Sequence, residues 1–304
     1  YALGVDANFW INLQSNYDKE LADYEEFNEI SSEEISIIQK IKKITDYAKD
    51  IRIIDPDAEG SILVIELRKL LNISKLTHIG EISQSGAYRL SVADNVDADV
   101  LFTWLRITDL ITERQQLGVE LNLELLKEKL PVIRALTFED IETIHIELKE
   151  HLAECGIKFA IVKHFTGAPV QGVIKKSNDG TLSLIMTLRR KFADVFWFTF
   201  FHEIGHILNG DIKDRVIDYE GIENETESKA DQFAADLLLD PKKYMEFVEF
   251  GDFSLPMINK LCEELEIPSY ILIGRLQRDK HIEYKYYSSQ KIRYDLDDIE
   301  RKIG

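Results

Sequence analysis

The chain has 304 residues, which is long enough for two or three domains. Hydrophobic residues make up 45% of it and there are only 6 Pro, a composition that excludes a mainly disordered or fibrous chain. Asp and Glu number 55 against 37 Lys and Arg, for a net charge of -18. Because such a charge repels a phosphate backbone, we do not expect this chain itself to bind nucleic acid.

Neither a membrane span nor a disulfide framework is indicated. The longest nearly apolar stretch, residues 195–201, is far shorter than the roughly 20 residues that cross a bilayer. Cys155 and Cys262 lie far apart and in no metal-binding spacing, as is usual in a reducing compartment. We therefore expect a cytoplasmic protein without a membrane partner. The chain starts at Tyr1 with no signal-peptide pattern, and we expect its natural N-terminus to lie upstream.

The first half of the chain is predicted to be mainly helical. Apolar residues spaced by four predict a helix over residues 6–24, and Ser31 with Glu34 forms a capping-box pattern before a helix that extends to about Lys49. Further helices are expected over residues 61–71, 97–106, 107–117, 121–130 and 138–155.

The pattern changes after Gly156, where short apolar or alternating runs predict strands over residues 158–163, 172–176 and 182–188. Residues 177–180 predict a hairpin turn between the last two strands. Helices are expected over residues 193–208, 223–239, 255–265 and 268–277. The expected fold class is α+β, mainly helical, with a small three-stranded antiparallel sheet packed on helix 193–208.

The most informative motif is His202-Glu203-Ile204-Gly205-His206. Two histidines four apart lie on one side of a helix and can bind one zinc ion, with the intervening Glu203 beside the metal as a general base. The preceding residues 196–201 are too apolar for a solvated helix, so these histidines are expected to be buried. The competing interpretation, two histidines that only hydrogen-bond within a core, leaves costly buried imidazoles.

A catalytic zinc site needs a third protein ligand and an open fourth position. We expect Glu227 to be this ligand, because it lies in a predicted helix whose small residues Ala230 and Ala234 permit close approach to the first helix. Glu223 and Glu225 are alternatives nearby, at the expected start of the same helix. Asp231, one turn after Glu227, is expected to orient a ligand histidine from behind.

The segment from Arg189 to His206, the run 227–234 and the run 237–241 together resemble the ImmA/IrrE family of zinc metallopeptidases. Weaker similarity extends from about Leu67 to Gln277, so it covers most of the chain. This resemblance implies a zincin-like domain. It also implies zinc binding by the residues His202, His206 and Glu227, and a general-base role for Glu203. The spacing of Glu227 and Asp231 is also similar to that of the gluzincins.

Residues 2–18 resemble the last helix of a HigA-type helix-turn-helix domain. The alternative is a surface helix whose aromatic residues serve packing. The resemblance implies DNA binding only through a domain upstream of this chain. The expected organisation is therefore a helix-turn-helix remnant (1–30), a helical linker domain (31–130), a zinc metallopeptidase domain (131–245) and a C-terminal helical region (246–304).

These features predict a zinc endopeptidase that cleaves a helix-turn-helix repressor or antitoxin and so controls stress, mobile-element or defence genes. His164 and Tyr219 are candidates for stabilising the transition state. The alternative function is a non-proteolytic sensor that regulates a DNA-binding, antitoxin-like transcription factor. The oligomeric state that we expect is a homodimer.

Overall fold

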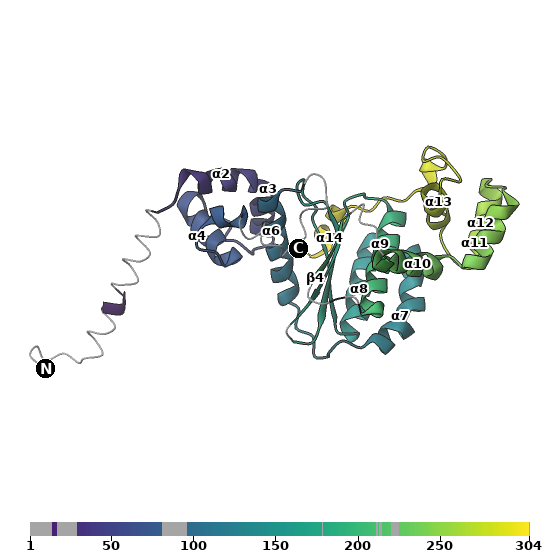
Figure 1. The fold of residues 1–304 in the computed structure, drawn as a ribbon, viewed down its shortest axis with the longest axis horizontal. Helices are drawn as coiled ribbons and strands as arrows, with labels where there is room; N and C mark the ends of the chain where they lie inside the picture. Colours follow the sequence, from purple (N-terminus) through teal and green to yellow (C-terminus); the bar gives the residue numbers. More distant parts are fainter. Residues whose placement is uncertain are drawn as a thin grey trace, which may run out of the picture. The chain divides into compact units, whose positions relative to one another are not determined.

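The structure, a computed structural model, describes residues 14–16, 29–80, 96–177, 179–210, 212, 215–219 and 225–303. The chain divides into two compact units (Figure 1). Of the described residues, those up to 107 belong to unit 1 and those from 108 onward to unit 2. No described helix is both long enough and apolar enough to cross a membrane.

The described part of unit 1 consists of α2 (Ser32–Lys40), α3 (Lys42–Asp50), α4 (Gly60–Leu71), the 3-10 turn η1 (Leu76–His78) and the start of α6 (Ala98–Glu113). The predicted capping box is confirmed: Ser31 Oγ accepts from Glu34 N, and Glu34 Oε2 accepts from Ser31 N. The helix predicted to run to Lys49 is interrupted at Ile41, and residues 97–117, predicted as two helices, contain the single helix α6.

Most of the predicted N-terminal helix, and with it the segment that resembles a helix-turn-helix domain, lies outside the described residues. Residues 14–16 are helical. The helix-turn-helix remnant therefore stays a prediction.

Unit 2 contains the remaining helices: α7 (Leu123–Ala135), η2 (Leu136–Phe138), α8 (Ile141–Glu154), α9 (Ala193–Asn209), α10 (Glu225–Leu238), α11 (Pro241–Phe250), α12 (Leu255–Leu265), α13 (Ser269–Arg278), η3 (Ser288–Gln290) and α14 (Leu296–Ile303). The helices predicted over 193–208, 223–239, 255–265 and 268–277 are confirmed to within two residues at each end. The sequence patterns missed α11 and α14. The predicted domain boundaries near residues 130 and 245 fall inside α7 and α11.

The sheet of unit 2 corrects the prediction in two respects. Among the described residues it has four strands, β1 (Ile157–Val162), β2 (Val170–Lys176), β3 (Leu182–Thr187) and β4 (Arg215–Tyr219), in the order β1-β3-β2-β4. The sheet is mixed, because β3 pairs antiparallel with β2 and parallel with β1. The hairpin of β2 and β3 forms as expected, but β3 lies between β2 and β1. Because β2 runs opposite to β1 and β3 returns antiparallel to β2, β3 has the direction of β1.

A side chain pairs with the backbone of one residue, Phe159, on the buried edge of the sheet. Every residue of β1 and β3 is buried, and β1 is an edge strand. Gln115 forms both bonds: its Nε2 donates to Phe159 O at 2.9 Å and its Oε1 accepts from Phe159 N at 3.2 Å. Buried backbone groups need such partners. Strand β4 lies at the other end of the sheet.

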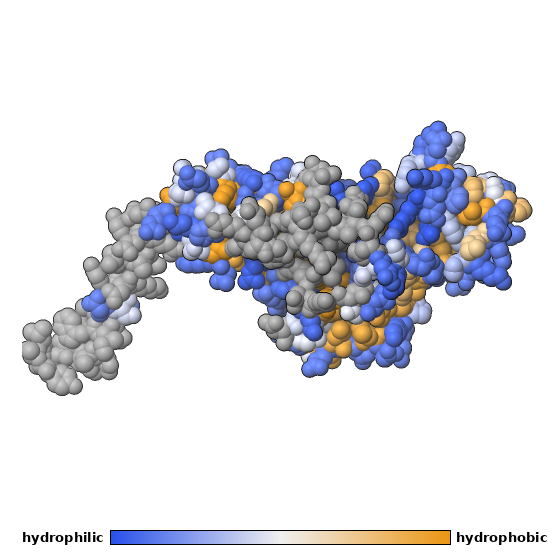
Figure 2. Space-filling view, viewed as in Figure 1, coloured by the Kyte–Doolittle hydropathy of each residue, from blue (hydrophilic) through white to orange (hydrophobic). Residues whose placement is uncertain are grey.

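The helices α7, α8, α9 and α10 lie on one side of the sheet (Figure 1). Helix α9 is the centre of the core, with Trp197, Phe200 and Phe201 fully buried. It ends at Gly210, which adopts the left-handed conformation with φ 72° that commonly ends a helix. The visible face is mostly hydrophilic (Figure 2), with hydrophobic residues gathered over α7 and α8. Val132 and Ile146 in these helices are exposed.

The C-terminal segment is bound to the start of α9. Lys291 Nζ lies 2.7 Å from Asp194 Oδ2, and both side chains are buried. Trp197 Nε1 donates to Tyr294 OH at 3.0 Å. Helix α9 is therefore held by the sheet at one side and by the C-terminal segment at its N-terminal end.

Candidate metal centre

Helix α9 brings His202 and His206 to the same side, one turn apart. Both side chains are buried, with exposed fractions of 7% and 1%. Their rings are perpendicular, and their Nε2 atoms lie 3.0 Å apart. Two imidazole nitrogens that face each other at this distance are arranged to bind a common proton or a common cation.

Helix α10 approaches α9 closely where both helices carry small residues. A Cβ placed on Gly205 would lie 3.1 Å from Ala230 Cα and 3.2 Å from Phe233 Cδ1. The two helices therefore approach each other too closely at Gly205 to accommodate a larger side chain easily. Ala230 is fully buried at this contact. This close packing lets Glu227, one turn before Ala230 in α10, reach the two histidines.

Glu227 Oε2 lies 3.1 Å from His202 Nε2 and 3.4 Å from His206 Nε2. Among the described residues, these three side chains form a group whose ligand atoms all lie within 4.8 Å of one another and that could hold a metal ion. Zinc ligands at 2.0–2.1 Å in tetrahedral geometry are separated by about 3.3 Å. The observed separations of 3.0, 3.1 and 3.4 Å fit this requirement, and the donor set of two imidazoles and one carboxylate is typical of catalytic zinc.

The two histidines keep Glu227 ionised. Hydrogen bonding with His202 and then with His206 lowers the pKa of Glu227 to about 2, although partial burial opposes the shift. A metal-binding carboxylate must be deprotonated. The geometry therefore presents Glu227 in the protonation state that a cation needs.

Asp231 lies behind His202, on the side away from Glu227. Its Oδ1 is 2.8 Å from His202 Nδ1, so Asp231 accepts a hydrogen bond from the Nδ1 proton, and a metal that displaced the proton shared by Nε2 and Glu227 would find the Nε2 lone pair. Burial raises the pKa of Asp231, but the hydrogen bond from His202 and the charge of Arg278 outweigh it, so the net pKa is lowered. The carboxylate is thus ionised beside the imidazole.

Glu203 is completely buried, with an exposed fraction of 0%. Its carboxylate lies against the backbone of β2, where a Cβ on Gly172 would overlap Glu203 Oε1, Cδ and Cγ. Gly172 therefore provides the space for this side chain. In the sheet, Gly172 pairs with Asp218 of β4, next to an irregularity between Val170 and Gly172. Glu203 consequently lies between the helix layer and β2, the strand next to β4.

Of the other sequence candidates, Glu225 and His164 are not members of the three-residue group. Glu225 is exposed and its Oε1 pairs with Lys229 Nζ at 2.8 Å, while Glu223 is outside the described residues. His164 follows β1 and is half-buried; burial and then the charge of Arg189 lower its pKa. Tyr219 ends β4 and pairs with Val170 through the backbone. The roles suggested for His164 and Tyr219 stay predictions.

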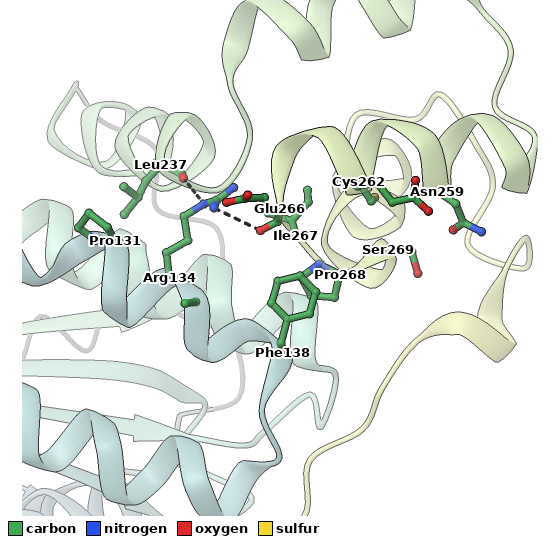
Figure 3. Close-up of a pocket in the computed structure, with 12 residues that line it drawn as sticks. Pro131, Arg134, Phe138, Leu237, Asn259, Cys262, Glu266, Ile267, Pro268 and Ser269 are labelled. Carbon is green, nitrogen blue, oxygen red and sulfur yellow. Dashed lines mark hydrogen bonds between the residues drawn. The ribbon is translucent and has the colours of Figure 1, made fainter.

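A separate cavity of about 930 Å³ lies between α7, α10, α12 and α13 (Figure 3). None of its lining residues belongs to the metal group. Arg134 donates across it to Leu237 O at 3.0 Å, to Leu238 O at 3.2 Å and to Leu265 O at 2.7 Å. These bonds satisfy the carbonyl groups that α10 and α12 leave unpaired at their C-terminal ends. Arg134 therefore stabilises the ends of α10 and α12 beside the cavity.

Comparison with known proteins gives no independent identification. No protein-family model and no curated protein matches this chain.

Sequence reasoning missed three features of the centre. Gly172, strand β4 and Arg278 contribute through contacts between segments far apart in the chain. Strand β4 had a weak local signal, the β-branched pair Val216 and Ile217. Gly172 and Arg278 had none.

Proposed function

We propose that the protein is a zinc-dependent endopeptidase. The observation that carries this proposal is the convergence of His202 Nε2, His206 Nε2 and Glu227 Oε2, with Glu203 adjacent to one ligand in the same helix. A structural zinc site usually has four protein ligands, whereas three ligands leave a position for water or substrate. Three ligands and a neighbouring carboxylate therefore favour catalysis.

The metal and the residues of the chain have separate roles in the proposed reaction. Bound zinc would supply a water of lowered pKa and would polarise the scissile carbonyl. Glu203 accepts the proton of the attacking water and returns it to the leaving amine as general base and then general acid. Its complete burial separates the carboxylate from bulk solvent, so the water that it deprotonates would be the one held at the metal. Asp231 holds His202 in the tautomer that binds through Nε2.

Strand β4 gives a route for peptide binding. It is the last strand of the sheet next to β2, the strand on which the Glu203 carboxylate rests. An extended peptide would add to such an edge through backbone hydrogen bonds, which is a sequence-tolerant way to hold a protein substrate. The motif resemblance to the ImmA/IrrE family supports a helix-turn-helix repressor or antitoxin as that substrate.

Zinc content per chain, measured by native mass spectrometry, tests the ligand set. We expect one zinc in the unmodified protein, and weakened or lost zinc in His206→Ala and in Glu227→Gln. Glu225→Gln is the matched control, because Glu225 pairs outward with Lys229. Absence of zinc from the unmodified protein after it is added back would contradict the proposal.

The catalytic step is tested with Glu203→Gln, which retains the ligands and removes the base. This variant should bind zinc and capture the substrate without cleaving it. If it instead retains full function in cells, proteolysis is not the activity and a sensor function is favoured.

A further inference from the structure

The two carboxylate oxygens of Asp231 point to different partners. Oδ1 lies 2.8 Å from His202 Nδ1, and Oδ2 lies 2.5 Å from Arg278 Nη2. The side chains of Asp231 and Arg278 are 45% and 48% exposed. Arg278 is the last residue of α13, so a helix outside the motif region contacts the carboxylate that supports a ligand histidine.

The position of α13 is fixed one turn earlier in the same helix. A Cβ on Gly274 would overlap Oδ2, Cβ and Cγ of Asp194, so the Asp194 side chain of α9 packs directly against the backbone of α13 here. Asp194 is itself held by Lys291, at 2.7 Å. Gly274 and Arg278 are four residues apart and therefore share one face of α13. The contact at Gly274 sets the register that brings Arg278 to Asp231.

An aspartate that supports a histidine must hold one oxygen in line with the Nδ1 proton. A half-exposed carboxylate can rotate toward water, and the alignment is then lost. Arg278 restrains this rotation because its guanidinium forms a charge-assisted hydrogen bond with the second oxygen. Exposed ion pairs contribute little to global stability, typically about 0–1 kcal/mol, so the effect of this pair is expected at the imidazole instead of in overall folding.

We propose that Arg278 is a positioning residue of the metal centre, which acts through Asp231 to hold the His202 imidazole in its metal-binding orientation and tautomer. The proposal rests on the proposed function in that the metal is taken to be zinc. It extends the centre from α9 and α10 to α13, which lies beyond the HExxH and Glu227 motifs.

A double-mutant cycle tests whether Arg278 acts through Asp231. Zinc affinity is measured by competition with a chromophoric chelator for the unmodified protein, Arg278→Gln, Asp231→Asn and the double variant. We expect Arg278→Gln to weaken binding by about 5-fold, less than the 10–100-fold typical of a partner that touches the ligand directly. In the Asp231→Asn background, Arg278→Gln should have no further effect. Equal affinity of Arg278→Gln and the unmodified protein, or independent multiplying effects, would overturn the proposal.

Two further variants separate positioning from folding. Lys191→Gln breaks a pair of similar exposure, Lys191 Nζ to Asp295 Oδ2 at 2.7 Å, away from the metal group, and should leave zinc affinity unchanged. Arg278→Lys retains the charge without the planar donor group and should restore part of the affinity. It also serves as the test variant if Arg278→Gln does not fold.

A readout without metal distinguishes this proposal from the proposed function. The chain has 7 His, so ring nitrogens of ¹⁵N-histidine-labelled protein can be resolved by NMR. The Nδ1–H of His202 should give a strongly hydrogen-bonded signal in the unmodified protein, because it faces Asp231 Oδ1, and this signal should weaken in Arg278→Gln, whether or not Nε2 is also protonated toward Glu227. If the unmodified protein binds no zinc, the proposed function fails, and the Nδ1–H measurement still decides the role of Arg278. An unchanged His202 spectrum in Arg278→Gln would refute that role.

Discussion

The carboxylate of Glu203 occupies the space that a side chain would fill at Gly172 of β2. No other residue type fits there without displacing the proposed base, because even the Cβ of alanine would overlap the carboxyl group. The distance between a base and the water that it activates is tightly constrained in catalysis. The identity of residue 172 is therefore linked to the position of residue 203, although they belong to different elements.

Gly172→Ala is expected to leave zinc binding intact and to lower kcat/KM by about 100-fold, since misplacement by about 1 Å has effects of this size. The measurement is cleavage of the protein that Glu203→Gln captures, alongside zinc content. Gly118→Ala is the control, because a Cβ there meets nothing within 4 Å. Normal turnover by Gly172→Ala would show that Gly172 does not position Glu203.

Asp179, in the turn between β2 and β3, gives a pH-dependent contribution to stability. Hydrogen bonds from Lys158 and then Thr181 lower the pKa of Asp179 from 3.8 to about 2. A lowered carboxylate pKa stabilises the fold above the unfolded-state value near 4, and this stabilisation is lost as the pH falls toward 2. Because the Asp179 side chain is 52% exposed, screening reduces the effect to about 0.5–1 kcal/mol.

Asp179→Asn should therefore lower the free energy of unfolding at pH 7, and the difference from the unmodified protein should shrink between pH 4 and pH 3. Urea unfolding at these pH values measures it. A difference that is constant over the whole range would mean that the carboxylate charge is not the source.

At the scale of elements, the distance between α9 and α10 determines whether Glu227 reaches the histidines. In an exposed helix, replacing glycine with alanine stabilises by about 1 kcal/mol. At Gly205 the new methyl group would lie 3.1 Å from the Ala230 backbone, which neither helix can relieve by rotating a side chain. We expect separation of the helices to outweigh the gain in helix propensity.

Gly205→Ala should consequently weaken zinc binding by about 10-fold or more, in the range seen when the support of a ligand is lost. Chelator competition measures the affinity, and thermal unfolding of the metal-free protein measures the effect on packing. Tighter zinc binding together with higher stability would show that α10 adjusts without losing the ligand geometry.

The sequence was sufficient to predict the fold and the site where the contacts that determine them are local. His202 and His206 share a face because of helix periodicity alone, and the small Ala230 indicated how close α10 approaches. The sheet was predicted wrongly as three-stranded and antiparallel, because the hairpin between β2 and β3 is a local feature but the parallel pairing of β3 with β1 is not. Arg278 reaches Asp231 across 47 positions of sequence, and no local pattern marks such a pair.

At the scale of the whole molecule, the metal group lies entirely within unit 2, and unit 1 has a polar cluster of its own. Glu34 is fully buried and binds Arg68 through two hydrogen bonds of 2.9 and 2.6 Å. It also accepts from Leu76 N at 2.9 Å. This cluster joins α2, α4 and η1. A buried charge that loses its partner destabilises strongly, by about 3–5 kcal/mol.

Glu34→Gln is therefore expected to lower the free energy of unfolding of unit 1 by about 3 kcal/mol and to leave zinc affinity unchanged. Denaturant unfolding followed by circular dichroism, with zinc release recorded in the same titration, separates the two events. Lys40→Gln is the control, because Lys40 is 46% exposed in its pairs with Asp97 and Asp99 and should have little effect. If zinc release shifts with the unfolding of unit 1, the two units unfold as one cooperative structure, and the metal centre depends on the helical unit before it.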